Sequence, residues 1–240
     1  TISLELIFAD IETLTKRMDR VGKMTKSGDK KAIAEMELLR RIKEHLDNGK
    51  PVRTMELTDD ERDTIKDAFF LTDKKVIYVA NVSENQISTI DTDPYVQKVR
   101  EYAKAEGAEV IALCAKLEEE LSELDDEDKE MLMKDYGIDE SGLDKLIKAS
   151  YSLLGLISFL TAGKQECRAW TIKKGTKAPQ AAGKIHSDFE RGFIKAEVVS
   201  YDDLIKYGSM NATKEKGLVR LEGKDYIVKD GDIILFRFNV

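Results

Sequence analysis

Four residues, Asn81-Val82-Ser83-Glu84, directly follow an apolar run at residues 76–80 and combine an amide with a carboxylate. An amide both donates and accepts hydrogen bonds, whereas a carboxylate only accepts them, so together they can read the polar edge of a ligand. The apolar run predicts a strand, and open α/β sheets bind ligands beyond the carboxyl ends of their strands. We therefore expect a binding corner at this sheet edge.

The chemistry of this corner suits a purine base. Common GTPases read guanine with Asn-Lys-x-Asp, whose aspartate accepts hydrogen bonds from guanine N1–H and the exocyclic amino group. Here Glu84 is one methylene longer than aspartate, and Val82 replaces the lysine whose stem packs on the base. These changes weaken guanine recognition, whereas the Asn81 amide can pair with the N6 and N7 edge of adenine. The motif thus favours ATP, although Asn is also common in turns and Glu84 could simply begin a helix.

A second motif, Cys114-Ala115-Lys116, follows a predicted strand at residues 109–113. It is similar to the Ser-Ala-Lys loop whose backbone closes over the base in the same class of nucleotide-binding domain. Replacing that serine by Cys114 preserves a backbone N–H contact but removes a hydroxyl contact. Two such motifs in the right order are more specific than one.

The phosphate-binding half of such a domain is not found in the sequence. No Gly-x-x-x-x-Gly-Lys-Ser/Thr run occurs among the 240 residues. That run supplies backbone N–H groups and a lysine to the phosphates, and a hydroxyl to Mg²⁺. We therefore expect these residues to select a base without hydrolysing a nucleotide, and we assign no catalytic residue and no metal ligand among them.

Helices and strands alternate around the two motifs. Helices are predicted at residues 59–68 and 93–106 and strands at residues 74–80 and 109–113, which is typical of a parallel α/β sheet. Two crossover units are too few for a stable sheet, so we expect residues before Thr1 to complete it.

Local signals support these boundaries. Thr58 and Glu61 fit a capping box at the start of the first of these helices, and Gly107 fits the end of the second. An acidic helical connector is predicted over residues 118–150. Residues 58–150 therefore form one predicted segment, the carboxyl-terminal part of a nucleotide-binding domain and its connector.

Residues 1–57 predict an antiparallel helical hairpin. Apolar residues recur every three or four positions from Leu4 to Val21, and again from Ile33 to Leu46, so each half carries one apolar stripe. Ser27-Gly28-Asp29 separates the halves, and Asn48-Gly49-Lys50-Pro51 is a plausible stop. Since the first stripe has begun by residue 4 and residue 1 is Thr rather than Met, we expect the chain to begin inside a larger polypeptide.

The hairpin carries a concentrated positive charge although the whole chain has a net charge of -7. Residues 16–31 hold seven Lys or Arg and two Asp, hence +5. Such a cluster can contact a phosphate backbone, or it can be a solvated surface that only maintains solubility. The candidate RNA contacts here are Lys16, Arg20, Lys23, Lys26, Lys30 and Lys31. Lys173, Lys174, Lys177 and Lys184 form a second basic group, of which Lys173 and Lys174 are the main candidates.

The remaining composition excludes several classes. Two cysteines, Cys114 and Cys167, without CxxC spacing argue against a disulfide framework or a cysteine-rich zinc site and fit a reducing cytoplasm. No apolar stretch approaches the roughly 18 residues that a membrane helix needs. Because the chain is acidic overall, we expect no sequence-specific DNA binding.

Residues 151–240 predict a small α+β module. Short strand-like runs at residues 168–172, 193–199, 226–228 and 233–238 are separated by glycine turns, which together with one helix suggests a β-grasp-like fold. For His45, His186 and Trp170 the structural interpretation outweighs a catalytic or RNA-stacking one.

The most specific stretches are APQAAGKIHSDFERGFIKAE at residues 178–197 and EGKDYIVKDGD at residues 222–232. They resemble the TGS domain that closes the YchF-type Obg-like ATPases, and the resemblance covers essentially the whole chain. It implies a P-loop domain interrupted by a helical hairpin, then a TGS domain, in a cytoplasmic ATPase that uses ATP and Mg²⁺ and associates with the ribosome and its rRNA. It also implies that adenine is held by Asn81, Val82, Glu84, Cys114, Ala115 and Lys116.

Two other interpretations stay open at this point. The chain could be a non-enzymatic RNA or ribosome adaptor in which the sheet is a spacer between two basic ends. Alternatively, the β-grasp-like module could belong to a nucleotide-sensing regulatory domain for another enzyme.

Overall fold

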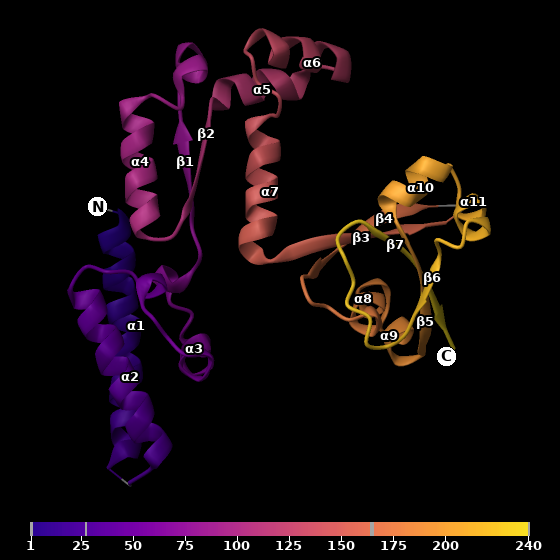
Figure 1. Cartoon of the computed structure of the whole chain (residues 1–240). Coiled ribbons are helices and arrows are strands. Elements are labelled where there is room, and N and C mark those ends of the chain that lie inside the picture. The colour runs from indigo at the N-terminus through magenta and orange to yellow at the C-terminus, as the bar shows by residue number, and fades with distance from the viewer. Residues whose placement is uncertain (1, 27, 164–165, 240) are drawn as a thin grey trace. The chain divides into compact units, whose positions relative to one another are not determined.

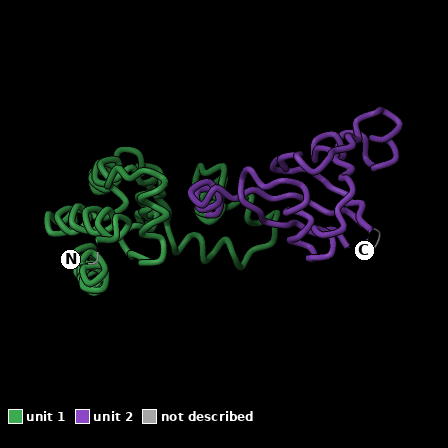
Figure 2. The backbone as a smooth tube through the Cα atoms, turned by 90° about the horizontal axis from the view of Figure 1, so that it is seen from below, with its two compact units in different colours: residues 1–146 green, residues 147–240 purple. Residues whose placement is uncertain are grey.

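The computed structural model describes residues 2–26, 28–163 and 166–239. The chain divides into two compact units, residues 1–146 and residues 147–240, shown in different colours in Figure 2. No helix in the described ranges is long and apolar enough to cross a membrane. Each unit is taken in turn.

The first unit begins with the predicted helical hairpin. Helices α1 (Ile2–Thr25) and α2 (Lys30–Asp47) pack side by side (Figure 1). The Asp29 carboxylate accepts a 2.9 Å hydrogen bond from the Lys31 N–H and so caps α2, while Gly28 takes a positive φ of 76° that most other residues avoid. Ser27, the first residue of the predicted break, lies outside the described residues.

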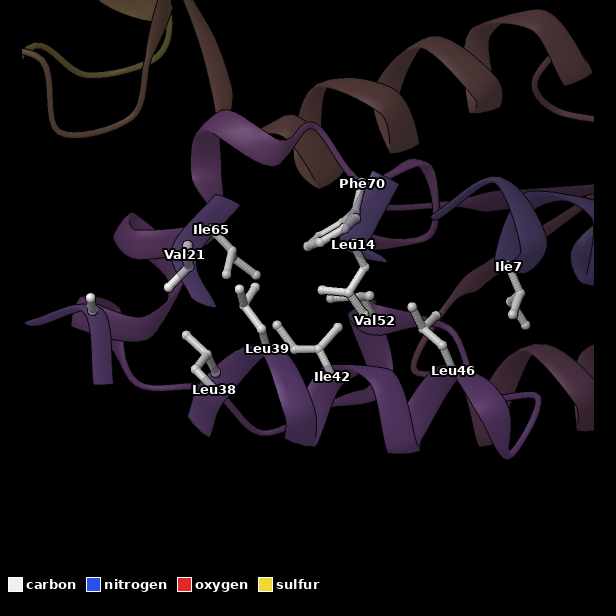
Figure 3. Close-up of a cluster of buried hydrophobic side chains, with 11 residues drawn as sticks. Ile7, Leu14, Val21, Leu38, Leu39, Ile42, Leu46, Val52, Ile65 and Phe70 are labelled. Atoms are coloured by element: carbon white, nitrogen blue, oxygen red, sulfur yellow. The ribbon is translucent and has the colours of Figure 1, made fainter. Parts of the chain in front are cut away.

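The hairpin core combines its two apolar stripes with the segment that follows (Figure 3). Leu14 of α1 and Leu39 and Ile42 of α2 are fully buried and lie against Val52 and Phe70. The stripe is narrower than the sequence pattern predicts, because three of its members remain exposed. These are Leu4, Phe8 and Ile33.

A buried acid anchors the segment that leads out of the hairpin. Asp10 on α1 accepts hydrogen bonds from the backbone N–H groups of Leu71 (2.7 Å) and Thr72 (2.8 Å). These belong to the short 3₁₀ turn η3 (Leu71–Asp73), which precedes strand β1 (Ile77–Asn81). The predicted strand at residues 74–80 therefore starts too early, because this 3₁₀ turn extends to residue 73 and β1 begins only at residue 77.

The other short elements of this segment follow the sequence signals. They are η1 (Val52–Thr54), α3 (Asp59–Ile65), η2 (Lys66–Ala68) and η4 (Glu84–Thr89). The Thr58 hydroxyl accepts from the Glu61 N–H and the Glu61 carboxylate accepts from the Thr58 N–H, so the predicted capping box is confirmed. The predicted helix at residues 59–68 is accordingly α3 continued by η2.

Strand β1 pairs in parallel with β2 (Glu109–Leu113) through the crossover helix α4 (Pro94–Ala105). Asp93 accepts from the N–H groups of Tyr95 and Val96 at the start of α4, and Gly107 adopts a positive φ of 67° just beyond its end. The α/β part of the fold prediction is confirmed as one β-α-β unit with a two-stranded sheet.

The predicted acidic connector consists of three helices rather than one continuous run. They are α5 (Ala115–Glu123), α6 (Asp126–Asp135) and α7 (Gly142–Leu154). The Glu118 carboxylate accepts from the N–H groups of Gly142 and Leu143 and so satisfies the start of α7. Only glycine fits at residue 142, because a Cβ there would lie 2.5 Å from the Cβ of Leu113.

The second unit contains a five-stranded sheet with the order β4-β3-β7-β5-β6. Its strands are β3 (Leu156–Ala162), β4 (Cys167–Lys173), β5 (Phe193–Ser200), β6 (Arg220–Glu222) and β7 (Asp232–Phe238). Strands β3 and β7 are parallel and the other neighbours are antiparallel. Helix α8 (Ala178–Ile185) buries Ala178, Ala181 and Ala182 against Phe159 and Ile172 of the sheet, so the α+β prediction is confirmed.

Several details of the predicted module were wrong. The expected single helix is joined by α9 (Ser187–Arg191), α10 (Tyr201–Tyr207) and α11 (Met210–Glu215). Residues 226–228 form no strand, because only Ile227 makes an isolated bridge to Lys177. Strand β3 was missed because its apolar residues continue those of α7, and Gly155, with a positive φ of 63°, is the break between them.

Candidate base-binding site

The parallel register brings the two polar motifs of the sequence together. Asn81 ends β1 opposite Leu113, which ends β2, and the Val82 N–H donates a 2.9 Å hydrogen bond to the Leu113 carbonyl. Residues that follow the two strands therefore lie next to each other at the carboxyl edge of the sheet, as the sequence pattern predicts.

A direct hydrogen bond joins the motifs. The Asn81 Oδ1 atom accepts a 3.0 Å hydrogen bond from the backbone N–H of Ala115, the first residue of α5. This bond fixes the orientation of the Asn81 amide and satisfies one of the free N–H groups at the start of the helix. Its Nδ2 group then remains available to donate to an acceptor atom on a bound base.

Glu84 and Lys116 form an ion pair beside this bond. The Lys116 Nζ atom lies 3.0 Å from Glu84 Oε1 and 3.7 Å from Glu120 Oε1. The hydrogen bond and charge of Glu84, followed by the charge of Glu120, raise the pKa of Lys116 above its usual value, so the lysine is fully charged at neutral pH. Four of the six predicted site residues, Asn81, Glu84, Ala115 and Lys116, thus converge at one edge.

The other two predicted site residues are buried. Val82 and Cys114 are 8% and 4% exposed and pack in one hydrophobic cluster with Ile87 and Leu117. Their side chains pack between β1 and α5 and are therefore not available to a ligand. Contact with a base through the Val82 side chain, in place of a lysine stem, does not fit this packing.

Gln86 was not among the predicted site residues but organises the loop. Its side-chain oxygen accepts from the Ser83 N–H at 3.0 Å, and its Nε2 group donates to Asp93 Oδ2 at 2.8 Å. The loop after β1 is therefore tied to the start of α4. The signal was present in the sequence, because Ser83-x-x-Gln86 is the spacing of a capping box.

The predicted basic residues are exposed on the surface of their own units. Lys23 lies in the last turn of α1, and Lys30 and Lys31 begin α2, so they share the free end of the hairpin. Lys16 is paired with Glu12 at 2.6 Å. In the second unit Lys173 is the last residue of β4 and Lys174 directly follows it.

The histidines and the tryptophan have structural partners. His45 Nε2 lies 2.9 Å from the Thr54 hydroxyl, and His186 Nδ1 accepts a 3.2 Å hydrogen bond from the Asp188 N–H at the start of α9. The Trp170 indole N–H donates to the Thr161 hydroxyl at 2.9 Å. These contacts fit the structural interpretation of all three residues.

Comparison with known proteins identifies the family. Residues 156–239 match the family model of the YchF GTPase carboxyl-terminal domain, described as a protein of unknown function (DUF933). All 240 residues align at 56% identity with the ribosome-binding ATPase YchF of Bacillus subtilis (strain 168), covering 66% of that protein. The chain belongs to the YchF family.

Other YchF proteins agree with this assignment. The ribosome-binding ATPase YchF of Haemophilus ducreyi is 47% identical over the whole chain, which covers 65% of it. The solved structure of the Schizosaccharomyces pombe YchF GTPase superposes with a TM-score of 0.87 at 32% identity, covering 98% of this chain and 64% of that one. The chain thus spans about two thirds of the length of the YchF relatives it matches, and the predicted family resemblance is confirmed.

Proposed function

We propose that this chain contributes the helical hairpin, the base-binding corner and the TGS domain of a ribosome-associated, ATP-preferring P-loop NTPase of the Obg-like class. The observation that carries the proposal is the hydrogen bond from the Ala115 N–H to Asn81 Oδ1. It joins two motifs 34 residues apart at the carboxyl edge of a parallel sheet, where this class of fold binds nucleotides. The relatives' printed name, ribosome-binding ATPase, supports the same function.

In this proposal the residues of the chain choose the base and do not cleave the phosphate. Asn81 donates to the base through its Nδ2 group, the paired Glu84 and Lys116 lie beside the base, and the backbone around Cys114 and Ala115 closes over the ring. We place the glycine-rich loop and the hydroxyl that would hold the phosphates and Mg²⁺ in the third of the YchF relatives' length that this sequence does not cover. Hydrolysis, ATP and Mg²⁺ are therefore proposed for the full-length protein, which would act in the cytoplasm.

The proposal is tested by the Asn81→Ala variant of the full-length protein. The substitution removes both the bond that holds Ala115 and the donor to the base, so ATP affinity should fall about tenfold, in line with the loss of two ordinary hydrogen bonds. Asn48→Ala, at the exposed end of α2, is the matched control and should bind ATP like the wild type. Equal ATP affinity in Asn81→Ala and the wild type would contradict the proposed base site.

A second candidate function is a non-enzymatic RNA or ribosome adaptor. The exposed cations at the end of the hairpin favour it, because an excess of positive charge attracts RNA without any nucleotide site. The two functions predict different ATP titrations. An adaptor shows no saturable ATP binding even as the wild type and keeps full ribosome binding in Asn81→Ala. The proposed NTPase binds ATP as the wild type and loses affinity in Asn81→Ala.

A further inference from the structure

The Glu84 carboxylate forms an ion pair with Lys116. Its Oε1 atom lies 3.0 Å from Lys116 Nζ, and the Glu84 side chain is 34% exposed. Lys116 directly follows Ala115, whose N–H bonds Asn81, so the same turn of α5 contacts both polar residues of the first motif. Glu120, one turn further along α5, lies 3.7 Å from the same ammonium group and gives it a second partner.

The Nδ2 donor of Asn81 does not distinguish adenine from guanine. The Ala115 N–H occupies one of the two lone pairs of Asn81 Oδ1, so Nδ2 is the group of this amide that has no hydrogen bond to the loop of the second motif. That donor suits N7, which is an acceptor in both purines. A further contribution to the choice of base is therefore expected at the Watson–Crick edge of the ring, where Glu84 is the acid of the motif.

A free carboxylate at that edge would favour the wrong base for an ATP-preferring protein. Guanine presents the N1–H and N2 amino donors there, which a carboxylate accepts well. Adenine presents one donor there, the N6 amino group, next to the lone pair of N1, which a carboxylate repels. The length of Glu84 alone does not remove this bias, since a longer side chain can still turn toward the base.

We propose that Lys116 is a specificity-determining residue of the proposed base site. By pairing with Glu84 it withdraws the carboxylate from the Watson–Crick edge of a guanine and reduces its repulsion of adenine N1. This inference rests on the proposed function, because it assumes that a purine binds beside Asn81. The choice between adenine and guanine, which was expected of the first motif alone, is thereby shared with a residue of the second motif.

Substituting Lys116→Met in the full-length protein tests the role. Methionine keeps an unbranched apolar stem that can pack on a base but removes the cation. GTP should bind more tightly, and the preference for ATP over GTP should fall roughly fivefold, the upper end of the effect expected of an exposed ion pair. Lys116→Arg, which retains the cation, should keep the wild-type preference. Lys134→Met on the exposed face of α6 is the matched control and should also keep it.

The Glu84→Gln background shows whether Lys116 acts through the carboxylate. In that background Lys116→Met should leave the ATP-to-GTP preference unchanged, because no carboxylate remains to be released. If Lys116→Met weakens ATP and GTP equally, or leaves their ratio as in the wild type, the role of Lys116 is contradicted while the base site stands. Equal ATP affinity in the wild type and in Asn81→Ala would contradict the proposed function instead.

Discussion

Tyr78 belongs to a hydrogen-bonded cluster of side chains around Glu106, near the proposed base-binding corner. It lies on β1 three residues before Asn81, and its hydroxyl donates a 2.8 Å hydrogen bond to Glu106 Oε2. Burial and this carboxylate raise the pKa of Tyr78 to about 12. Burial opposes ionisation of Glu106, but hydrogen bonds from Arg53 and two tyrosines outweigh it and lower the pKa of Glu106. The cluster is thus a carboxylate surrounded by donors.

The raised pKa of Tyr78 makes stability depend on alkaline pH. The folded pKa of about 12 exceeds the ordinary value of 10, so the hydroxyl stabilises the fold fully below pH 10 and the stabilisation is lost as the pH rises toward 12. A phenolate absorbance titration of the folded protein should show late-titrating tyrosines, one of which Tyr78→Phe removes. Tyr226, whose pKa is also raised to about 12, should still titrate late in that variant. A titration that is complete near pH 10 would contradict this account.

Residue types and spacing predicted the site only in part. Asn81 and Ala115 could be placed together because the carboxyl ends of parallel strands share one sheet edge. The ion pair between Glu84 and Lys116 was not predictable, because it joins residues 32 positions apart and depends on how α5 starts. The burial of Val82 was also not predicted, because the side chain of a residue after a strand can point either to the sheet edge or to the core.

At the scale of elements, a partly buried ion pair joins the segment after the hairpin to the α/β part of the first unit. Arg53 of η1 donates to Glu106 Oε2 at 2.7 Å, just after α4, and its Nη1 group donates to the Thr72 carbonyl at 3.2 Å. The two charged side chains are 13% and 10% exposed. The pair therefore connects three segments that are far apart in the sequence.

Removing one partner of this pair should destabilise the first unit. Arg53→Met leaves the partly buried Glu106 carboxylate without its cation, so the free energy of unfolding should fall by about 2 kcal/mol. Urea unfolding monitored by circular dichroism measures the change. Arg40→Met, on the exposed face of α2, is the matched control and should change stability by less than about 0.5 kcal/mol. A loss below about 1 kcal/mol in Arg53→Met would show that the pair adds little.

Long periodic elements were predictable and short ones were not. The helices α1, α2 and α4 each carry a repeated apolar spacing, and α2 and α4 also begin at an aspartate cap, so their positions follow from the sequence. Strand β6 has three residues and no alternation of burial that a pattern could reveal. The order of strands in the second unit depends on β7 pairing between β3 and β5, which is a tertiary choice rather than a local one.

At the scale of the whole molecule, charge is divided unevenly along a chain with two compact units. The hairpin end is basic, whereas α5 and α6 carry many of the acidic residues that give the chain its net charge of -7. A polyanion would meet this molecule at the hairpin more favourably than at the acidic helices. The proposed ribosome contact therefore belongs to the hairpin.

Reversing the charge of the hairpin end tests this contact. The full-length protein with Lys23, Lys26, Lys30 and Lys31 changed to Glu should sediment with ribosomes at least tenfold less, because the phosphate attraction is replaced by repulsion. ATP affinity should not change, since these residues are remote in sequence from Asn81 and make no described contact with the base-binding corner. Four exposed lysines elsewhere in the same unit provide the matched control, Lys66, Lys74, Lys98 and Lys104. Ribosome binding that falls equally in both reversals would mean that only total charge matters.

The most direct test of the account is the affinity of the full-length wild-type protein for ATP and for GTP, measured by calorimetric titration at one salt concentration. Asn81 joined to Ala115, with Glu84 paired to Lys116, predicts that ATP binds several-fold more tightly than GTP. Equal affinities, or tighter binding of GTP, would contradict it.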